Sequence, residues 1–307
     1  MKLRRWLSRA LVLAMVVALM IPVPVAAKSS AGGKQVKSVT YYDVDGSGQG
    51  WEIDRKVSYS YGSKNMPTEV TYTNYTTFLG VPVGGSSSTF KVKYGKKSGK
   101  EYDTAGFVSG KFTFKGSNIT SWSSESKWSE KRKKADGTVV DWASMSAQVG
   151  HAAYFKNGLM KSEDATYSGD NSDNNQYAWT QNAIYAWTQK KGVPSMMVQT
   201  WVANGKDDDG NTYDGKAQTY YAIFNSKGLV VEEGVVSEGK NEPFAAYTYT
   251  MKKGKVDTVV RYYIDYETKQ PKPSQMLKFK YTKKSVSKTY NLRVINSILG
   301  VDGFRWF

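Results

Sequence analysis

Tyr247-Thr-Tyr-Thr-Met-Lys-Lys-Gly-Lys-Val-Asp-Thr-Val259 is the stretch that decides the fold of this chain. Tyr247 and Tyr249 stand one residue apart, a polar turn ends at Gly254, and Val256 and Val259 resume the apolar pattern. Alternating aromatic and apolar residues on both sides of a tight polar turn are typical of a β-hairpin. The stretch therefore predicts two antiparallel strands.

The same pattern recurs along the chain at unequal intervals, whereas strict solenoids keep a fixed period. Unequal intervals indicate a meander of hairpins of different lengths. We predict an all-β protein, an antiparallel meander of tandem β-hairpins forming an extended twisted sheet or open barrel over residues 38–284. Within it, residues 123–150 predict a protruding hairpin, and residues 164–182 and 204–216 predict long loops. The further copies begin at Tyr59, Phe112, Tyr154, Tyr185, Phe224 and Phe279.

The two ends of the chain differ from this pattern. Residues 1–27 combine a basic start, an apolar run and a small-residue end at Ala27, which predicts a cleaved secretory signal peptide; an uncleaved membrane anchor is the alternative. Residues 28–37 are small and polar and predict a flexible leader. In residues 285–307, Tyr290, Val294 and Ile298 fall four apart, which predicts a short amphipathic helix that caps the sheet.

Composition points to the cell envelope. Subtracting the four cations of the signal peptide from the 43 Lys and Arg leaves 39 against 27 Asp and Glu, a net charge of +12. The chain contains no Cys, so disulfides, a thiol nucleophile and a Cys-based zinc site are excluded. No later apolar run is long enough to predict a transmembrane segment in the mature chain. We expect a bacterial protein that is secreted, or retained non-covalently at the envelope, with no nucleic-acid partner; the sequence leaves its oligomeric state open.

The stretch Tyr247-Thr-Tyr249 with Gly254-Lys-Val256 resembles the YD-repeat family of bacterial surface and toxin-shell proteins. Thr250 stands where that family has Asp, and the turn is one residue longer. The resemblance implies hairpins that wrap into a sheet without catalytic residues of their own. A second likeness, carried by residues 154–160 and 224–228, is to cell-wall-binding repeats, although their closing Gly-Trp is absent here.

An acidic stretch near the start of the mature chain has the spacing of a calcium loop. Asp43, Asp45, Ser47 and Asp54 occupy positions one, three, five and twelve, and Gly48 occupies position six. Oxygen ligands at this spacing predict a calcium site. The flanking residues look like strands rather than the helices of an EF-hand, so an Asp- and Gly-rich hairpin turn is the alternative. We expect no other cofactor.

Aromatic residues supply the candidate ligand-binding surface, since the chain has 22 Tyr and nine Trp. Residues of equal strand parity line one face, and flat aromatic rings with a polar edge can stack on sugars. The alternative is that these rings form the core of a sheet poor in Leu and Ile. The candidate ligand-binding residues are Trp122, Trp128, Trp179 and Trp187, together with Lys131 and Arg132 in the protruding hairpin.

Catalytic motifs are sparse. His151 is the single histidine, and no Gly-x-Ser-x-Gly elbow accompanies it. We therefore expect a non-enzymatic protein that binds a cell-wall glycan or an anionic envelope polymer through aromatic and lysine-rich surface. The alternatives are a structural scaffold without a small ligand, and a polysaccharide-active enzyme with paired carboxylates or with Tyr and Arg around His151.

Overall fold

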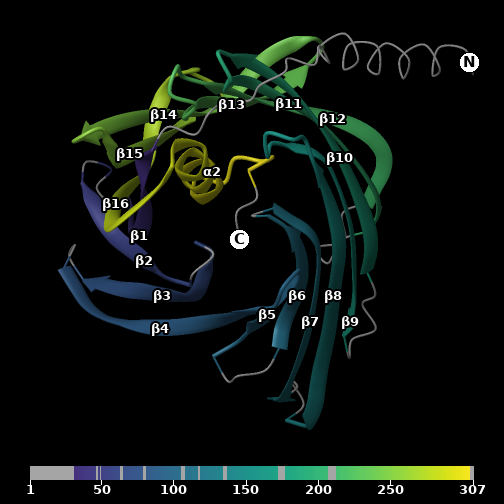
Figure 1. Ribbon diagram of the computed structural model, residues 1–307. Helices are drawn as coiled ribbons and strands as arrows, with labels where there is room; N and C mark the ends of the chain where they lie inside the picture. The colour runs from purple at the N-terminus through teal and green to yellow at the C-terminus, as the bar shows by residue number, and fades with distance from the viewer. Residues whose placement is uncertain are drawn as a thin grey trace, which may run out of the picture.

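The chain folds into a closed antiparallel β-barrel with one helix inside it, as a computed structural model shows (Figure 1). The structure describes residues 31–304 except 46, 47, 49, 63, 64, 79, 80, 105–107, 117, 134–136, 172–176 and 207–211. The strands are β1 (Ala31–Val44), β2 (Trp51–Tyr61), β3 (Pro67–Phe78), β4 (Val81–Tyr94), β5 (Ser98–Tyr102), β6 (Val108–Lys115), β7 (Asn118–Lys133), β8 (Val139–Tyr154), β9 (Met160–Asn171), β10 (Tyr177–Lys190), β11 (Val193–Lys206), β12 (Thr212–Phe224), β13 (Val230–Ser237), β14 (Lys240–Lys252), β15 (Lys255–Ile264) and β16 (Pro271–Ser287), and the helix is α2 (Lys288–Ile298).

Each strand pairs with its neighbours in the sequence, and β1 pairs with β16 to close the ring. The closing ladder runs from Ala31 opposite Ser287 to Asp43 opposite Gln275. The predicted all-β meander and C-terminal helix are confirmed. The expected open sheet or open barrel is corrected to a closed one, in which no strand keeps an unpaired edge.

The turns that end the aromatic pattern all lie at one end of the barrel, because they join even-numbered strands to the odd-numbered strands that follow. Lys191-Gly192 and Lys253-Gly254 have positive φ at both turn positions, as two-residue hairpins of type I′ require. Longer turns, such as the one that ends at Gly228, place glycine at positive φ. The pattern thus marks hairpin turns at a single end, which we call the closed end.

Four stretches differ from the prediction. Phe279 to Val286, expected as a further hairpin, lies within the single strand β16, and the lysines at 283 and 284 sit where the register with β1 shifts. Residues 164–171 and 177–182 are strand rather than loop, as are 204–206 and 212–216. β1 begins at Ala31, so residues 31–37 of the expected leader are strand. The predicted signal peptide, residues 1–27, lies outside the described residues.

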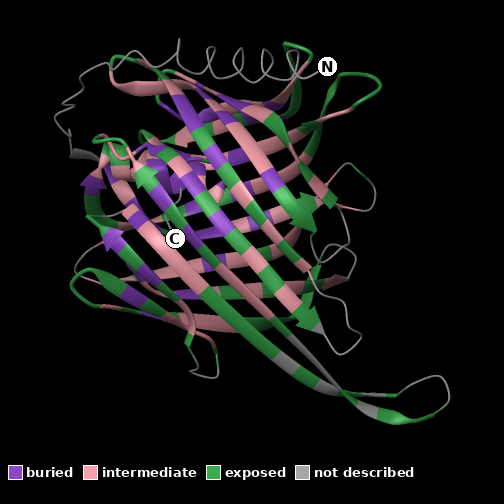
Figure 2. Ribbon diagram, turned by 90° about the vertical axis from the view of Figure 1, so that its right-hand side faces the viewer, coloured by how far each residue is buried: buried purple, intermediate pink, exposed green. Residues whose placement is uncertain are grey.

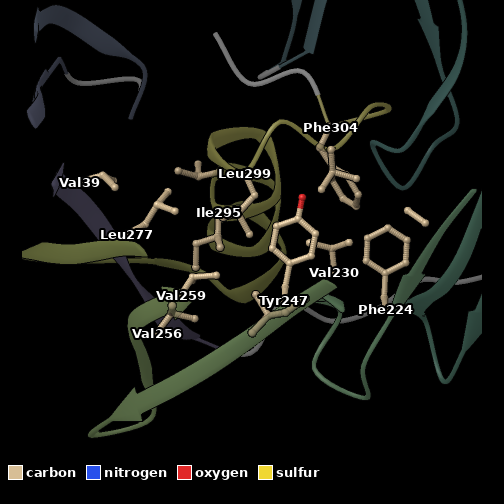
Figure 3. Packing of buried hydrophobic residues seen from close by; sticks show 14 of the residues in the cluster. Val39, Phe224, Val230, Tyr247, Val256, Val259, Leu277, Ile295, Leu299 and Phe304 are labelled. Atoms are coloured by element: carbon tan, nitrogen blue, oxygen red, sulfur yellow. The ribbon is translucent and has the colours of Figure 1, made fainter. Parts of the chain in front are cut away.

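Helix α2 fills the closed end of the barrel and completes its apolar core (Figure 3). Ser287 caps the helix by accepting a hydrogen bond from the Tyr290 backbone N–H. Ile295 and Leu299 pack among inward side chains of β1, β13, β15 and β16, and buried residues gather at this end (Figure 2). The predicted short C-terminal helix is confirmed, and it lies inside the ring at the closed end. The strand residues labelled around it are Val39, Phe224, Val230, Tyr247, Val256, Val259 and Leu277.

A ring of hydrogen bonds ties the strands together just inside the closed end. In six even-numbered strands, an inward aromatic residue at or near the closed end donates to a backbone carbonyl of the preceding odd-numbered strand. Burial favours such bonds because an unpaired hydroxyl away from water is costly. Phe114 and Phe224 take the equivalent place in β6 and β12 and pack instead. The donors, with bonds of 2.5 to 2.8 Å, are Tyr61, Tyr94, Tyr154, Trp187, Tyr249 and Tyr281.

The outer face of the barrel carries both polar and apolar residues. On β10, for example, the inward residues include Ala183 and Tyr185, and the outward ones include Thr180, Asn182, Thr188 and the exposed Ile184. Lysines along other strands share the outward parity, among them Lys56, Lys91, Lys100, Lys111, Lys278 and Lys280. No helix among the described residues is long and apolar enough to cross a membrane.

Candidate ligand-binding lumen

The half of the barrel away from the closed end has an interior open to solvent. Asn74 and Ser86 face each other on inward positions of β3 and β4, and both are exposed. Ser124 and Ser126, inward on β7, are exposed as well. A ring of sixteen strands is wide enough to leave an aqueous interior where no helix fills it. The barrel is therefore a cup, with a floor made by α2 and an open lumen.

A cavity of about 450 Å³ lies against the lumen wall formed by β2 to β5. Tyr72 and Phe90 make an aromatic corner, with ring centroids 5.7 Å apart and ring planes at 90°. Tyr72 is 40% exposed, so one part of its ring is available to a ligand. This combination of apolar surface and a few convergent polar groups is typical of small-molecule sites. We call this site the wall pocket; its remaining lining residues are Arg55, Val70, Asn74, Ser88 and Glu101.

One cation and one anion line the wall pocket. The Arg55 guanidinium lies 4.6 Å from the centre of the Tyr41 ring, in a cation–π contact. Glu101 accepts a hydrogen bond of 3.3 Å from the Ser109 hydroxyl. Burial raises the pKa of Glu101 above its ordinary value, and the Ser109 hydrogen bond opposes that shift. Burial also raises the pKa of Tyr72, with Glu101 adding to the rise and Arg55 opposing it.

A row of aromatic residues lines the lumen wall formed by β9 to β12. Tyr167 and Trp179 stack with ring centroids 4.1 Å apart and an interplanar angle of 8°. Tyr213 lies 5.5 Å from Trp179 and 5.7 Å from Trp201. Gly205 lies between Trp179 and Tyr213 in the register, and a Cβ there would come within 2.7 Å of the Trp179 Cα. The missing side chain lets the rings meet across β11, and all four rings are half-buried.

The candidate tryptophans separate into different environments. Trp179 belongs to the lumen row. Trp187 donates to the Met160 carbonyl and packs against Phe304, 5.1 Å away, so it belongs to the closed end. Trp122 packs over Gly150, where an added Cβ would meet its ring at 2.2 Å. The binding role proposed for the tryptophans from the sequence stays a prediction, and only Trp179 among these three lies in the lumen.

The candidate residues of the protruding hairpin lie on β7 and β8. Lys131 is exposed and stands opposite Asp141, and Trp128 and Arg132 stand opposite Ser144 and Val140. The side chains of Trp128 and Arg132 lie outside what the structure describes. The hairpin itself projects past its neighbours, since β6 pairs with β7 only as far as Ser124 (Figure 2).

The predicted calcium stretch forms the hairpin between β1 and β2. The Asp43 carboxylate accepts a hydrogen bond of 3.1 Å from the Gln275 side chain, and Asp54 lies 3.7 Å from Arg55. The Asp45 backbone N–H donates to the Gly50 carbonyl across the turn. Ser47 is not among the described residues, which also contain no cluster of three or more metal-ligating side chains of the His, Cys, Asp or Glu type. The calcium site stays a prediction.

His151 lies on the outer face, away from the lumen. Its Nδ1 is 3.0 Å from an Asp164 carboxylate oxygen on β9, and both side chains are exposed. Tyr and Arg do gather elsewhere, at Tyr247, which donates a hydrogen bond to Glu233 with Arg261 6.0 Å from its ring. Burial raises the pKa of Glu233, and Tyr247 and Arg261 lower it. This partly buried cluster lies inside the barrel, and the enzymatic alternative built around His151 is not assembled among the described residues.

Sequence reasoning missed the wall pocket. Arg55, Asn74 and Glu101 lie on three different strands, and only the closing of the ring turns them toward one space. The available signal was parity: Arg55 shares a face with Val57 and Tyr59, and Asn74 with Tyr72. A charged or amide residue on the inward face of a strand, among apolar residues, indicates that part of the barrel interior is polar.

Comparison with known proteins supports the fold. The chain is similar to a porin-like protein of Bacteroides uniformis, with a TM-score of 0.50 and 12% identity over 80% of this chain and 98% of that one. It is also similar to a porin-like protein of Bacteroides vulgatus, with a TM-score of 0.43 and 9% identity over 82% of this chain and 100% of that one. No family model and no curated protein matches the chain. The YD-repeat and cell-wall-repeat likenesses stay predictions.

Proposed function

We propose that this protein is a non-enzymatic binding protein of the bacterial cell envelope that holds a neutral oligosaccharide in the lumen of its barrel. The wall pocket carries the proposal, because it joins a partly exposed Tyr72 ring to amide, hydroxyl, guanidinium and carboxylate groups within one cavity. Sugars present apolar C–H faces and many hydroxyls, which match an aromatic ring surrounded by donors and acceptors.

The charges of the wall pocket favour a neutral ligand. Arg55 and Glu101 are of opposite sign and both influence Tyr72, so their fields offset each other where a ligand would lie. A hydroxyl can donate to Glu101 and accept from Arg55, whereas a ligand of a single charge would meet one like-charged group. The aromatic row on β9 to β12 adds a second stacking surface on another part of the wall, which suits a ligand of several sugar rings.

The outer face favours an aqueous setting for this barrel. A porin presents an apolar band to lipid and a polar interior. Here the outward positions carry lysines such as Lys93 and Lys100, and the interior of the closed end is apolar. A lysine that faces lipid near the bilayer midplane costs about 2–4 kcal/mol. These outward lysines therefore support a barrel that works beside the envelope, with its ligand entering from the open end.

Titration with soluble oligosaccharides tests the proposal. The probes are linear β-glucose, N-acetylglucosamine and α-glucose oligomers, followed by intrinsic tryptophan fluorescence and by calorimetry on residues 28–307. We expect at least one series to bind, and Tyr72→Ala or Glu101→Gln to weaken that binding about tenfold, equivalent to about 1.4 kcal/mol. Tyr266→Ala, at a tyrosine that is 82% exposed, is the matched control and should bind as the wild type does.

The result can contradict the proposal in three ways. Absence of binding with all three series would exclude a lumenal oligosaccharide site and leave a scaffold. Binding that survives Tyr72→Ala and Glu101→Gln but is lost on Trp179→Ala would move the site to the aromatic row. Release of shortened products during the titration would show hydrolysis and refute a non-enzymatic role.

A further inference from the structure

The outer wall formed by β4, β5 and β6 carries a row of lysines that stand directly opposite one another. Lys93 pairs with Lys100 across β4 and β5, and Lys100 pairs with Lys111 across β5 and β6. All three side chains are exposed. Directly paired residues of neighbouring strands lie about 4.5–5.5 Å apart. We call this set the lysine row; Lys91, Lys96, Lys97 and Lys115 flank it in the same segment.

Few acidic residues offset the row. Glu125 on the neighbouring strand β7 interacts electrostatically with Lys111, and it also forms an ion pair of 2.8 Å with Lys127. Residues 91–115 contain seven Lys, and their two acidic residues are Glu101, which faces the lumen, and Asp103, which follows the end of β5. Within the described ranges, no member of the lysine row forms an ion pair, although Lys93 lies 4.8 Å from the centre of the Tyr102 ring. Glu69 faces Lys91 one strand away from the row.

Like charges directly opposite each other destabilise a sheet. Their presence on three neighbouring strands therefore suggests a binding function that outweighs the loss of stability. Solubility needs only scattered lysines, as on the outer face of β16. A dense row creates a strong local positive potential that attracts anions and releases counterions when they bind. Lys binds phosphate as a point charge with rotatable donors, and the row contains no Arg, which would bind carboxylate or phosphate bidentately.

We infer that the lysine row is a docking surface for a linear polymer of closely spaced phosphodiester groups. Successive lysines across the strands would each meet one phosphate, so the polymer would cross the strands of the outer wall. This surface is independent of the wall pocket, which lies on the inner face of β2 to β5. A polymer held outside would keep the barrel at the envelope while the lumen remains open.

A charge-matched pair of variants tests this inference. The first is the triple variant Lys93→Gln, Lys100→Gln, Lys111→Gln. The second removes three exposed lysines from other strands, as Lys161→Gln, Lys190→Gln, Lys252→Gln. Both lose the same net charge. The probe is poly(glycerol phosphate), with dextran as the uncharged polymer and a single-stranded oligonucleotide of equal charge as the alternative phosphodiester. Binding is measured between 50 and 300 mM salt, and thermal unfolding is measured without polymer.

We expect the wild type and the scattered-lysine variant to bind poly(glycerol phosphate), with affinity that falls steeply with salt. The row variant should lose about tenfold or more in affinity at low salt, and its salt slope should fall by about 2 to 3, or roughly 0.7–0.9 per phosphate contact. Its unfolding temperature should rise, since the opposed charges are gone.

Equal losses in the two triple variants would show that net charge alone drives binding and would overturn the inference. Tighter binding of the oligonucleotide than of poly(glycerol phosphate) would overturn the assigned partner. An unfolding temperature that falls in the row variant would contradict the repulsion on which the argument depends. Sugar binding in the lumen should be the same in all three proteins, so failure of the proposed function remains distinguishable.

Discussion

Removal of the Asn296 side chain should detach α2 from the barrel wall. Asn296 is fully buried, with 0% of its surface exposed. Its Nδ2 donates to the Gly228 carbonyl at 2.8 Å, and its Oδ1 accepts from the Val230 backbone N–H at 3.2 Å. These two bonds join the helix to the β12–β13 turn. Asn296→Ala leaves both backbone groups buried without their partner.

The loss of stability can be estimated from those two backbone groups. A buried polar group that loses its partner costs about 1–3 kcal/mol. We therefore expect Asn296→Ala to lower the free energy of unfolding by about 2–6 kcal/mol, a large part of the roughly 5–15 kcal/mol typical of folded proteins. Thr289→Ala, at an exposed site on the same helix, should change it by at most about 0.5 kcal/mol.

Asn296→Asp gives the same test a pH dependence. The introduced carboxyl can still accept from Val230, but its second oxygen faces the Gly228 carbonyl and can donate only when protonated. Burial should hold the pKa of that carboxyl above its unfolded value of about 3.9. A folded pKa above the unfolded one means that the stability is fully present below the unfolded pKa and is lost as pH rises through the folded pKa.

Denaturant unfolding, followed by tryptophan fluorescence at pH 4 and pH 7, checks these expectations. At pH 4 the free energy of unfolding of the Asn296→Asp protein should approach that of the wild type. At pH 7 it should be lower, by about 1.4 kcal/mol for each unit by which the pKa is raised. The docking role of this side chain would be refuted if Asn296→Ala had a free energy of unfolding within about 0.5 kcal/mol of the wild type. It would also be refuted if the stability loss in Asn296→Asp were the same at both pH values.

Three other predictions concern the ring of hydrogen bonds, the barrel wall and the wall pocket. Tyr249→Phe removes one donor of the ring and should cost about 1–3 kcal/mol, because it leaves a buried carbonyl unpaired; denaturant unfolding measures it, and a neutral result would contradict the ring's contribution. Gly150→Ala forces a Cβ into the Trp122 ring and should destabilise the barrel by more than about 1 kcal/mol. In Gly110→Ala the nearest atom to the new Cβ is 3.6 Å away, so the same assay should show a much smaller loss of stability. Sugar binding should weaken as pH falls through the raised pKa of Glu101, and Glu101→Gln should remove that dependence; an unchanged pH profile in the variant would exclude the carboxylate as an acceptor.

Much of the fold was predictable because successive residues of a strand face opposite sides of the sheet, so the sequence alternates with the environment. The recurring aromatic pattern identified hairpins at Tyr59, Phe112, Tyr185 and Tyr247, and each of these turns exists. The pattern failed at Phe279, where two lysines in a β-bulge resemble a turn. A bulge and a turn use similar polar residues, and only the partner strand distinguishes them.

The sequence alone determined the elements of this protein: tandem antiparallel hairpins, a helix at the C-terminus, and faces of alternating aromatic and polar character. Those features are local, since they depend on residues a few positions apart. Tertiary structure decided the rest. Closure depends on β1 meeting β16, more than 200 positions away in the sequence, and closure determines which face of every strand becomes the interior. It sent Trp122 and Trp187 into packed surroundings and Trp179 into the lumen. It also gathered Arg55, Asn74 and Glu101 into one pocket, because side chains on separate strands share a space only after the ring has formed.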